Sequence, residues 1–147
     1  MKTLKLLIAI ISLSFFTSAF AQRGEHKKDE IESYKIAFIT KRLDLTSDEA
    51  TKFWPVYNQY QDELKELRSR NRKALVNVYQ NIETMSDADI AKVLDDELAF
   101  KQNELNLTKK YLPQFKTVLL VKKVAKLFKA EEDFKTELLK RMQQNNR

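Results

Sequence analysis

The 147-residue chain contains no cysteine, one histidine, one glycine and two prolines. With a lone histidine and no cysteine, the sequence offers no visible nucleophile–base pair and too few ligands for a zinc or copper site. Since Gly24 is the only glycine, the chain also lacks a glycine-rich loop that would bind phosphate groups. A β-rich domain of this length would need many turn residues. These absences predict an all-α protein that is not an enzyme and uses no cofactor.

The N-terminal residues have the pattern of an export signal. Lys2 and Lys5 precede an apolar run over residues 6–16, and Ala19-Phe20-Ala21 supplies a small-x-small cleavage sequence. We therefore predict a signal peptide over residues 1–21, cleaved after Ala21, and one all-helical domain over residues 22–147 with disordered ends. The alternative is a retained membrane anchor, but the run is shorter than the roughly 20 residues that a span needs. A soluble exported protein without a stable membrane span is the expected product.

The charge of the chain is mildly basic. Without Lys2 and Lys5, the formal net charge of +6 falls to about +4. This excess is spread along the chain and gives some preference for acidic partners, but it is not the concentrated basic patch of a nucleic-acid-binding protein. Export makes nucleic acid an unsuitable partner in any case. The absence of cysteine means that an oxidising compartment is used without disulfides.

Hydrophobic spacing predicts four helices, at about 29–42, 46–82, 86–119 and 120–143. Thr46-Ser47-Asp48-Glu49 is a capping box, and Ser86-Asp87-Ala88-Asp89 is a second helix start. The expected inward faces of the two longest helices step by three and four residues, close to a heptad seam. They are Ala50, Phe53, Tyr57, Tyr60, Leu64, Leu67, Asn71, Ala74 and Val78, and then Ile90, Leu94, Leu98, Lys101, Leu105, Thr108, Leu112, Phe115 and Leu119.

The two long helices predict an elongated antiparallel hairpin with short flanking helices. A hairpin of this kind is a single thin layer of helices that buries little apolar surface per residue. We therefore expect the protein to form a homodimer, which would bury more of that surface. Pro55 and Pro113 fall inside the long helical patterns, where each removes a backbone hydrogen bond and produces a kink. Bends at both prolines would curve the hairpin into a cradle-like shape.

Two groups of side chains are candidates for binding a client or partner. The first is the aromatic cluster Phe53, Trp54, Tyr57 and Tyr60, whose ordinary interpretation is a core stripe, with Trp54 the member expected to face outward. The second is the basic stripe Lys122, Lys123, Lys126 and Lys129, whose ordinary interpretation is a solvated helix face. If exposed, the aromatic stripe would mark a binding surface, and the lysines would attract acidic clients or anionic lipid.

A metal site has little support in the sequence. His26 with Glu25, Asp29 and Glu30 could hold a metal weakly, but a solvated terminus is the better interpretation. We therefore predict no metal ligands.

With these features in place, the chain resembles the LTxxQ-motif periplasmic proteins of the Spy/CpxP type. The likeness rests on the signal peptide, the all-helical chain and the motif residues Leu45, Thr46 and Glu49, with Glu49 at the motif's glutamine position. The segments FWPVYNQYQDEL (53–64) and KKVAKLFKAEEDFKTELLKRM (122–142) resemble a Gram-negative subgroup labelled sensors of ECF-type sigma factors. Two departures are evident: no second motif appears late in the chain, and the histidine ligands of the metal-sensing branch are missing.

The resemblance implies a small periplasmic stress protein that forms a curved, cradle-like dimer. The leading hypothesis is therefore a chaperone-like protein that binds unfolded polypeptide in the envelope-stress response. The alternative is a regulatory sensor that docks on a membrane-bound regulator of an ECF-type sigma factor. A metal sensor is the weaker third possibility.

Overall fold

The structure is a computed structural model that describes the backbone of residues 18–145 and the side chains of residues 29–144. The predicted signal peptide therefore lies mostly outside the described residues, and so do the last two residues of the chain. The side chain of His26 is likewise not described. Within residues 18–145, the long helices are α2 (Ser18–Leu43), α3 (Ser47–Asn81), α4 (Asp87–Val118) and α5 (Val121–Asn145), and a short 3-10 helix, η1 (Ile82–Thr84), follows α3.

The prediction of an all-α fold is confirmed, and the boundaries of the two long helices are close to those expected. α3 and α4 are 35 and 32 residues long, while the flanking helices α2 and α5 have 26 and 25 residues. The chain divides into two compact units, which are Leu45–Lys126 and the combination of residues 1–44 and 127–147. Each unit is described by itself.

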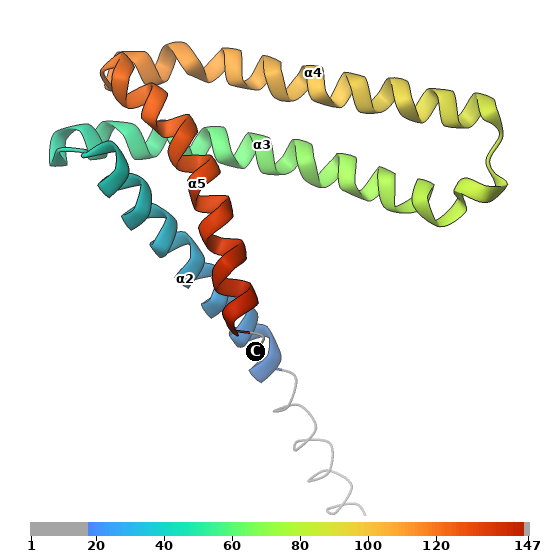
Figure 1. Ribbon diagram of the computed structural model, residues 1–147, viewed down its shortest axis with the longest axis horizontal. Coiled ribbons are helices and arrows are strands. Elements are labelled where there is room, and N and C mark those ends of the chain that lie inside the picture. Colours follow the sequence, from blue (N-terminus) through green and yellow to red (C-terminus); the bar gives the residue numbers. More distant parts are fainter. Residues whose placement is uncertain (1–17, 146–147) are drawn as a thin grey trace, which may run out of the picture. The chain divides into compact units, whose positions relative to one another are not determined.

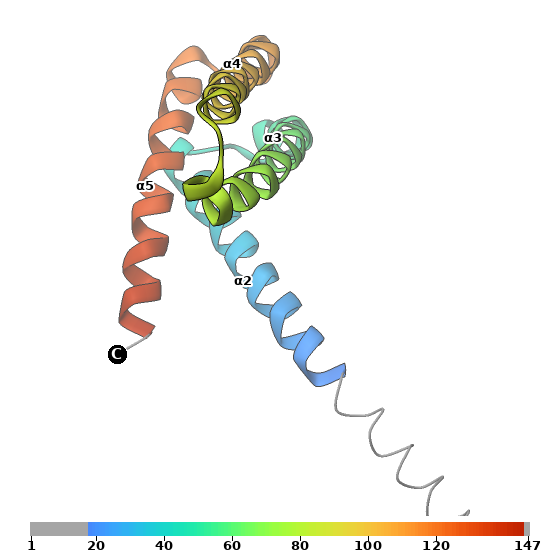
Figure 2. The same ribbon diagram turned by 90° about the vertical axis from the view of Figure 1, so that its right-hand side faces the viewer.

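The first unit is an antiparallel helical hairpin. α3 and α4 run side by side in opposite directions and are joined at one end by η1 and the residues around Met85 (Figures 1 and 2). The capping box that starts α3 is formed: Glu49 N–H donates to Thr46 Oγ1 (3.2 Å), and Thr46 N–H donates to Glu49 Oε2 (2.9 Å). Ser86 caps α4 by accepting from the N–H of Asp89 at 3.2 Å. Both helix starts satisfy backbone donors that have no partner within the helix.

The core of the hairpin is an aromatic cluster near the capped end of α3. Phe53 and Tyr57 from α3 meet Tyr111 and Phe115 from α4, and all four side chains are buried. The ring centroids of Phe53 and Phe115 are 5.9 Å apart, and those of Tyr60 and Tyr111 are 5.3 Å apart. Tilted and edge-on rings at such distances contribute beyond the area they bury. This cluster anchors the two helices to each other at one end.

Toward the η1 end, the expected inward face of α4 is wrong. Three of its leucines, Leu94, Leu98 and Leu105, are exposed, and Ala74 on α3 is exposed as well. Ile90 and Phe115 of the expected face are half-buried and buried, and the side chains buried or half-buried outside that face include Val93, Glu97, Phe100, Glu104 and Tyr111. A heptad row drifts by about 20° per seven residues around a straight helix unless the helices supercoil. The burial follows this drift, so a row that is inward at Phe115 and Leu119 has rotated outward at Leu98.

Pro55 and Pro113 lie inside α3 and α4, as predicted. Each lacks an N–H, so one carbonyl in the preceding turn of each helix loses its backbone hydrogen bond. Tyr60 and Thr108 are hydrogen-bonded across the hairpin at 3.2 Å, which places Pro55 and Pro113 at about the same level along it. Both prolines are exposed, so the interrupted backbone hydrogen bonds lie on the outer faces of the two helices at the aromatic end.

The second unit contains α2 and the C-terminal part of α5, which pack through large side chains. The aromatic rings of Tyr34, Phe38 and Phe134 lie 5.6–6.0 Å apart. Lys35 forms an ion pair with Glu131 at 3.7 Å. The buried residues Ile39, Leu43, Leu127, Ala130 and Phe134 complete this core. Near the end of α5, Met142 is half exposed.

Candidate binding surface of the hairpin

The aromatic cluster singled out in the sequence is divided between core and surface. Phe53 and Tyr57 are buried, with 0% and 3% of their surface exposed. Trp54 and Tyr60 are half-buried, and the Trp54 ring meets the edges of Phe53 and Tyr57 at centroid distances of 5.0 and 5.3 Å. Phe53 and Tyr57 thus form part of the core, and only Trp54 and Tyr60 retain surface that a partner can contact.

Beside the aromatic core, a charged cluster joins α3 to α4. Glu63 Oε1 accepts from the Tyr111 hydroxyl at 2.6 Å, and its two oxygens accept from Lys110 Nζ at 2.7 and 2.8 Å. The ammonium of Lys110, and then the hydroxyl of Tyr111, hold the pKa of Glu63 below its ordinary value. Burial, followed by the hydrogen bond to Glu63, raises the pKa of Tyr111. The hydrogen bond between them thus stabilises the ionised form of Glu63 and the protonated form of Tyr111.

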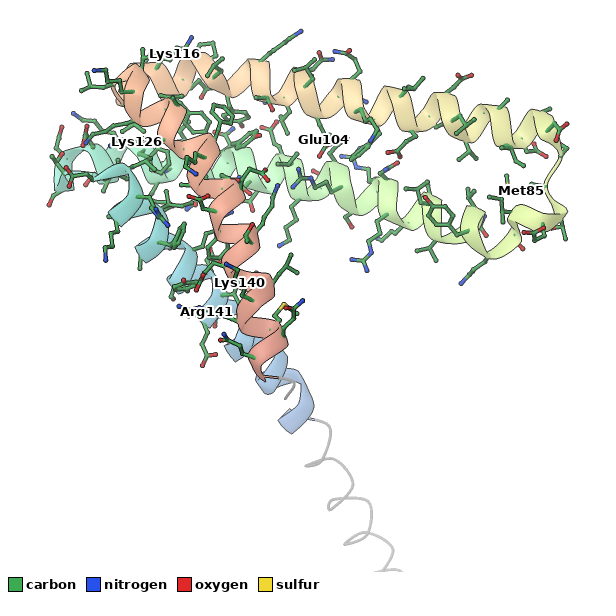
Figure 3. The ribbon with its side chains drawn as sticks, in the orientation of Figure 1. Met85, Glu104, Lys116, Lys126, Lys140 and Arg141 are labelled. Carbon is green, nitrogen blue, oxygen red and sulfur yellow. The ribbon has the colours of Figure 1, made fainter. Side chains whose placement is uncertain are left out.

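In the half of the hairpin nearer to η1, polar pairs join the two helices among half-buried apolar side chains. Arg68 Nε donates to Glu104 Oε1 at 2.6 Å, and Asn71 Nδ2 donates to Glu97 Oε2 at 3.0 Å. Figure 3 shows Glu104 on the side of α4 that faces α3. The amide of Asn71, and then Lys101, lower the pKa of Glu97. Because polar partners occupy the seam, the leucines that follow them in the sequence point elsewhere.

These cross-helix pairs fix which residues lie level with each other. Asn71 faces Glu97 and Arg68 faces Glu104, so Arg72 is level with Leu98 and Lys65 is level with Leu105. The next residue after a seam position lies about 100° further round its helix. In an antiparallel pair, such residues on the two helices project to the same side. Residues directly before a seam position project to the opposite side on both helices. Glu63 and Lys110 are two such residues, and they form an ion pair.

We call the resulting surface the open side. It is defined by the residues that directly follow Leu64, Asn71 and Val78 on α3 and Glu97, Glu104 and Tyr111 on α4. These residues are Lys65, Arg72 and Tyr79 on α3 and Leu98, Leu105 and Leu112 on α4. Leu98 and Tyr79 expose 66% and 67% of their surface, and Leu112 is half-buried. Leu94 and Val76 are exposed beside them. The open side thus carries an apolar row on α4 and two cations on α3.

The four lysines of the predicted basic stripe are in different situations. Lys123 Nζ donates to Glu49 Oε2 at 2.7 Å, and both side chains are mostly covered. Lys122 and Lys126 are exposed, and Lys129 forms an ion pair with Asp133 at 3.1 Å. Two of the four lysines are therefore engaged in intramolecular pairs, which weakens the interpretation of the stripe as a uniform docking surface.

The motif residues have a structural role. Glu49 completes the capping box of α3 and, with the same oxygen, binds Lys123 of α5. The hydrogen bond from Lys123, and then that from the Thr46 backbone, lower the pKa of Glu49. Leu45 is half-buried just before the cap. The motif thus links the start of α3 to the start of α5 within the hairpin unit.

The part of the chain with described side chains contains no cluster of metal-ligand residues. No three histidine, cysteine, aspartate or glutamate side chains lie close enough together there to hold a metal ion. The one site considered from the sequence, around His26, lies largely where side chains are not described.

Comparison with known proteins adds no relative. No protein-family model, curated protein or solved structure matches the chain. The resemblance to the Spy/CpxP type therefore stays a prediction based on the quoted motifs. Among the described helices, none has a stretch long and apolar enough to cross a membrane.

The open side is the feature that sequence reasoning missed. The leucine spacing was visible, but a heptad seam was expected to face the other long helix. Asn71 within the expected apolar face of α3 was the available signal, because a buried amide needs a polar partner such as Glu97.

Proposed function

We propose that this protein is a non-enzymatic, chaperone-like protein of the Spy/CpxP type that binds unfolded polypeptide in the periplasm. The observation that carries the proposal is the open side, where leucine, valine and tyrosine side chains are exposed and not packed between α3 and α4. Contiguous exposed apolar side chains are typical of a surface that binds another molecule. The exported location follows from the N-terminal sequence pattern and the motif resemblance.

The proposal is tested by measuring aggregation of α-lactalbumin after its disulfides are reduced. Because the chain contains no cysteine, the reductant unfolds the client without affecting the protein. At stoichiometric excess, the purified mature protein is expected to slow the rise in light scattering. An unchanged aggregation rate of α-lactalbumin at a tenfold excess of the protein would contradict the proposed chaperone-like function.

Location and oligomeric state are measured separately. Fractionation of expressing cells and N-terminal sequencing are expected to give periplasmic protein that begins at Gln22. Sedimentation equilibrium tests the predicted homodimer. Protein that keeps residues 1–21 and sediments with membranes would contradict the export part of the proposal.

A second candidate function is regulatory docking on a membrane-bound regulator of an ECF-type sigma factor. The seven-residue spacing on both helices of the open side favours it, because such spacing suits a folded helix more than an irregular chain. Cross-linking in intact cells followed by purification would identify the partner. Recovery of no inner-membrane regulator would count against this candidate.

A further inference from the structure

The open side has two parallel rows with the same seven-residue repeat. Lys65, Arg72 and Tyr79 form the row on α3, and Leu98, Leu105 and Leu112 form the row on α4. The register set by the Asn71–Glu97 and Arg68–Glu104 pairs places Arg72 level with Leu98 and Lys65 level with Leu105, so the rows overlap at these two positions. A single straight helix lying along the hairpin would contact both rows every second turn.

The charge on the open side is of one sign. Lys65 and Arg72 are exposed, and no ion pair is found for either among the residues with described side chains. The nearest carboxylates on α4 already have partners: Glu97 is bound by Asn71 and by Lys101 of its own helix, and Glu104 is bound by Arg68. A ligand that covers this side therefore meets leucines on α4 and uncompensated cations on α3.

We propose that the open side binds one acidic amphipathic helix of a partner protein, with its apolar face on the α4 leucines and its carboxylates toward Lys65 and Arg72. This proposal rests on polypeptide binding, which the two candidate functions share, and narrows the polypeptide to one that is helical when bound. The basic row selects the sign of the partner's charge, because like charges brought together at an interface oppose binding.

Two other occupants fit these features less well. A second copy of the chain docking by the same side would bring its own Lys65 and Arg72 and repel the first. An anionic membrane would satisfy the charges, but it has no feature that matches a seven-residue repeat on two parallel rows. The helix is therefore the occupant that uses both the spacing and the charge.

The test uses two synthetic 28-residue peptides, each with leucine at the a and d positions of four heptads. One carries glutamate at the flanking positions and the other carries lysine. Binding of each labelled peptide to the full mature protein is measured by fluorescence anisotropy. We expect the acidic peptide to bind at least tenfold more tightly than the basic one.

Variants assign the binding to the open side. The double variant Leu98→Gln/Leu105→Gln is expected to bind the acidic peptide at least tenfold more weakly than the unaltered protein does. The matched control Leu139→Gln, at an equally exposed leucine of α5, is expected to change affinity less than twofold. The charge reversal Lys65→Glu/Arg72→Glu should transfer the preference to the basic peptide. Because all these positions are exposed, far-ultraviolet circular dichroism should show every variant folded.

Several results would overturn the inference. Equal binding of both peptides, or equal effects of the leucine variants and Leu139→Gln, would show that the open side does not select an acidic helix. So would self-association that is abolished by Leu98→Gln/Leu105→Gln, or tighter binding to phosphatidylglycerol vesicles than to the acidic peptide. The lactalbumin assay separates this failure from that of the proposed function, since client protection without peptide selectivity would leave the proposed function standing.

Discussion

Replacing Phe115 with alanine is expected to destabilise the hairpin far more than replacing Leu98 on the same helix. Phe115 exposes 2% of its surface and packs against Phe53, Tyr60 and Tyr111, whereas Leu98 is 66% exposed. Removing a buried phenylalanine side chain costs about 3–5 kcal/mol of unfolding free energy. Replacing an exposed side chain that makes no cap, ion pair or core contact changes the free energy of unfolding by about 0.5 kcal/mol or less.

Urea denaturation measures both effects, with circular dichroism at 222 nm and fluorescence as the signals. Trp54 is the only tryptophan, and its ring lies 5.0 Å from that of Phe53, so its emission reports directly on the aromatic core. Because domains of this size are stable by only about 5–15 kcal/mol, Phe115→Ala could unfold the protein completely. The milder Phe115→Leu then gives a measurable transition, with an expected loss of about 1–2 kcal/mol.

Equal destabilisation by Phe115→Ala and Leu98→Ala would refute the reasoning. It would mean that Leu98 is buried against α3, as a heptad seam requires, and that the open side does not exist in solution.

Three further substitutions test the contacts of the hairpin. Thr46→Ala removes the cap of α3 and should cost about 0.5–2 kcal/mol in urea denaturation, against no loss for Thr136→Ala in mid-helix. The folded-state pKa of Glu49 lies below that of an ordinary glutamate, so its stabilising effect is full above the ordinary pKa and is lost as the pH falls through the folded-state pKa. Glu49→Gln should therefore lower the urea midpoint at pH 7 and flatten its decline between pH 7 and 3.5, and an unchanged slope would contradict this. Tyr111→Phe removes the hydroxyl donor to Glu63 and should raise the pKa of that carboxyl, as followed by carbon-13 NMR titration, while Tyr79→Phe should leave it unchanged.

Much of the fold follows from local sequence signals. The capping box at Thr46 and the side-chain cap at Ser86 set the starts of α3 and α4 to within a residue, because these hydrogen bonds join groups within four residues of each other. The burial of Phe53 and Tyr57 also follows from their spacing. These features depend only on neighbouring residues, so the chain alone was enough to predict them.

The rotation of α4 could not be read from spacing alone. A heptad row indicates that leucines share a stripe, but it does not say which neighbour the stripe faces or whether the helices supercoil. The rotation is instead set by long-range pairs such as Asn71–Glu97 and Glu63–Tyr111, whose partners are 26 and 48 residues apart. For the same reason, Lys123 was assigned to a docking stripe although Glu49, 74 residues away, binds it.

Site-specific cross-linking tests the central claim, that the open side contacts polypeptide, most directly. Since the chain has no cysteine, a single introduced cysteine can carry a benzophenone label at one defined position. Leu98→Cys places the label on the open side, and Asn103→Cys places it about 140° round the same helix at another exposed position. Irradiation with reduced α-lactalbumin is expected to give a strong cross-link from position 98 and little from position 103. Equal yields from the two positions, or a higher yield from position 103, would contradict the claim.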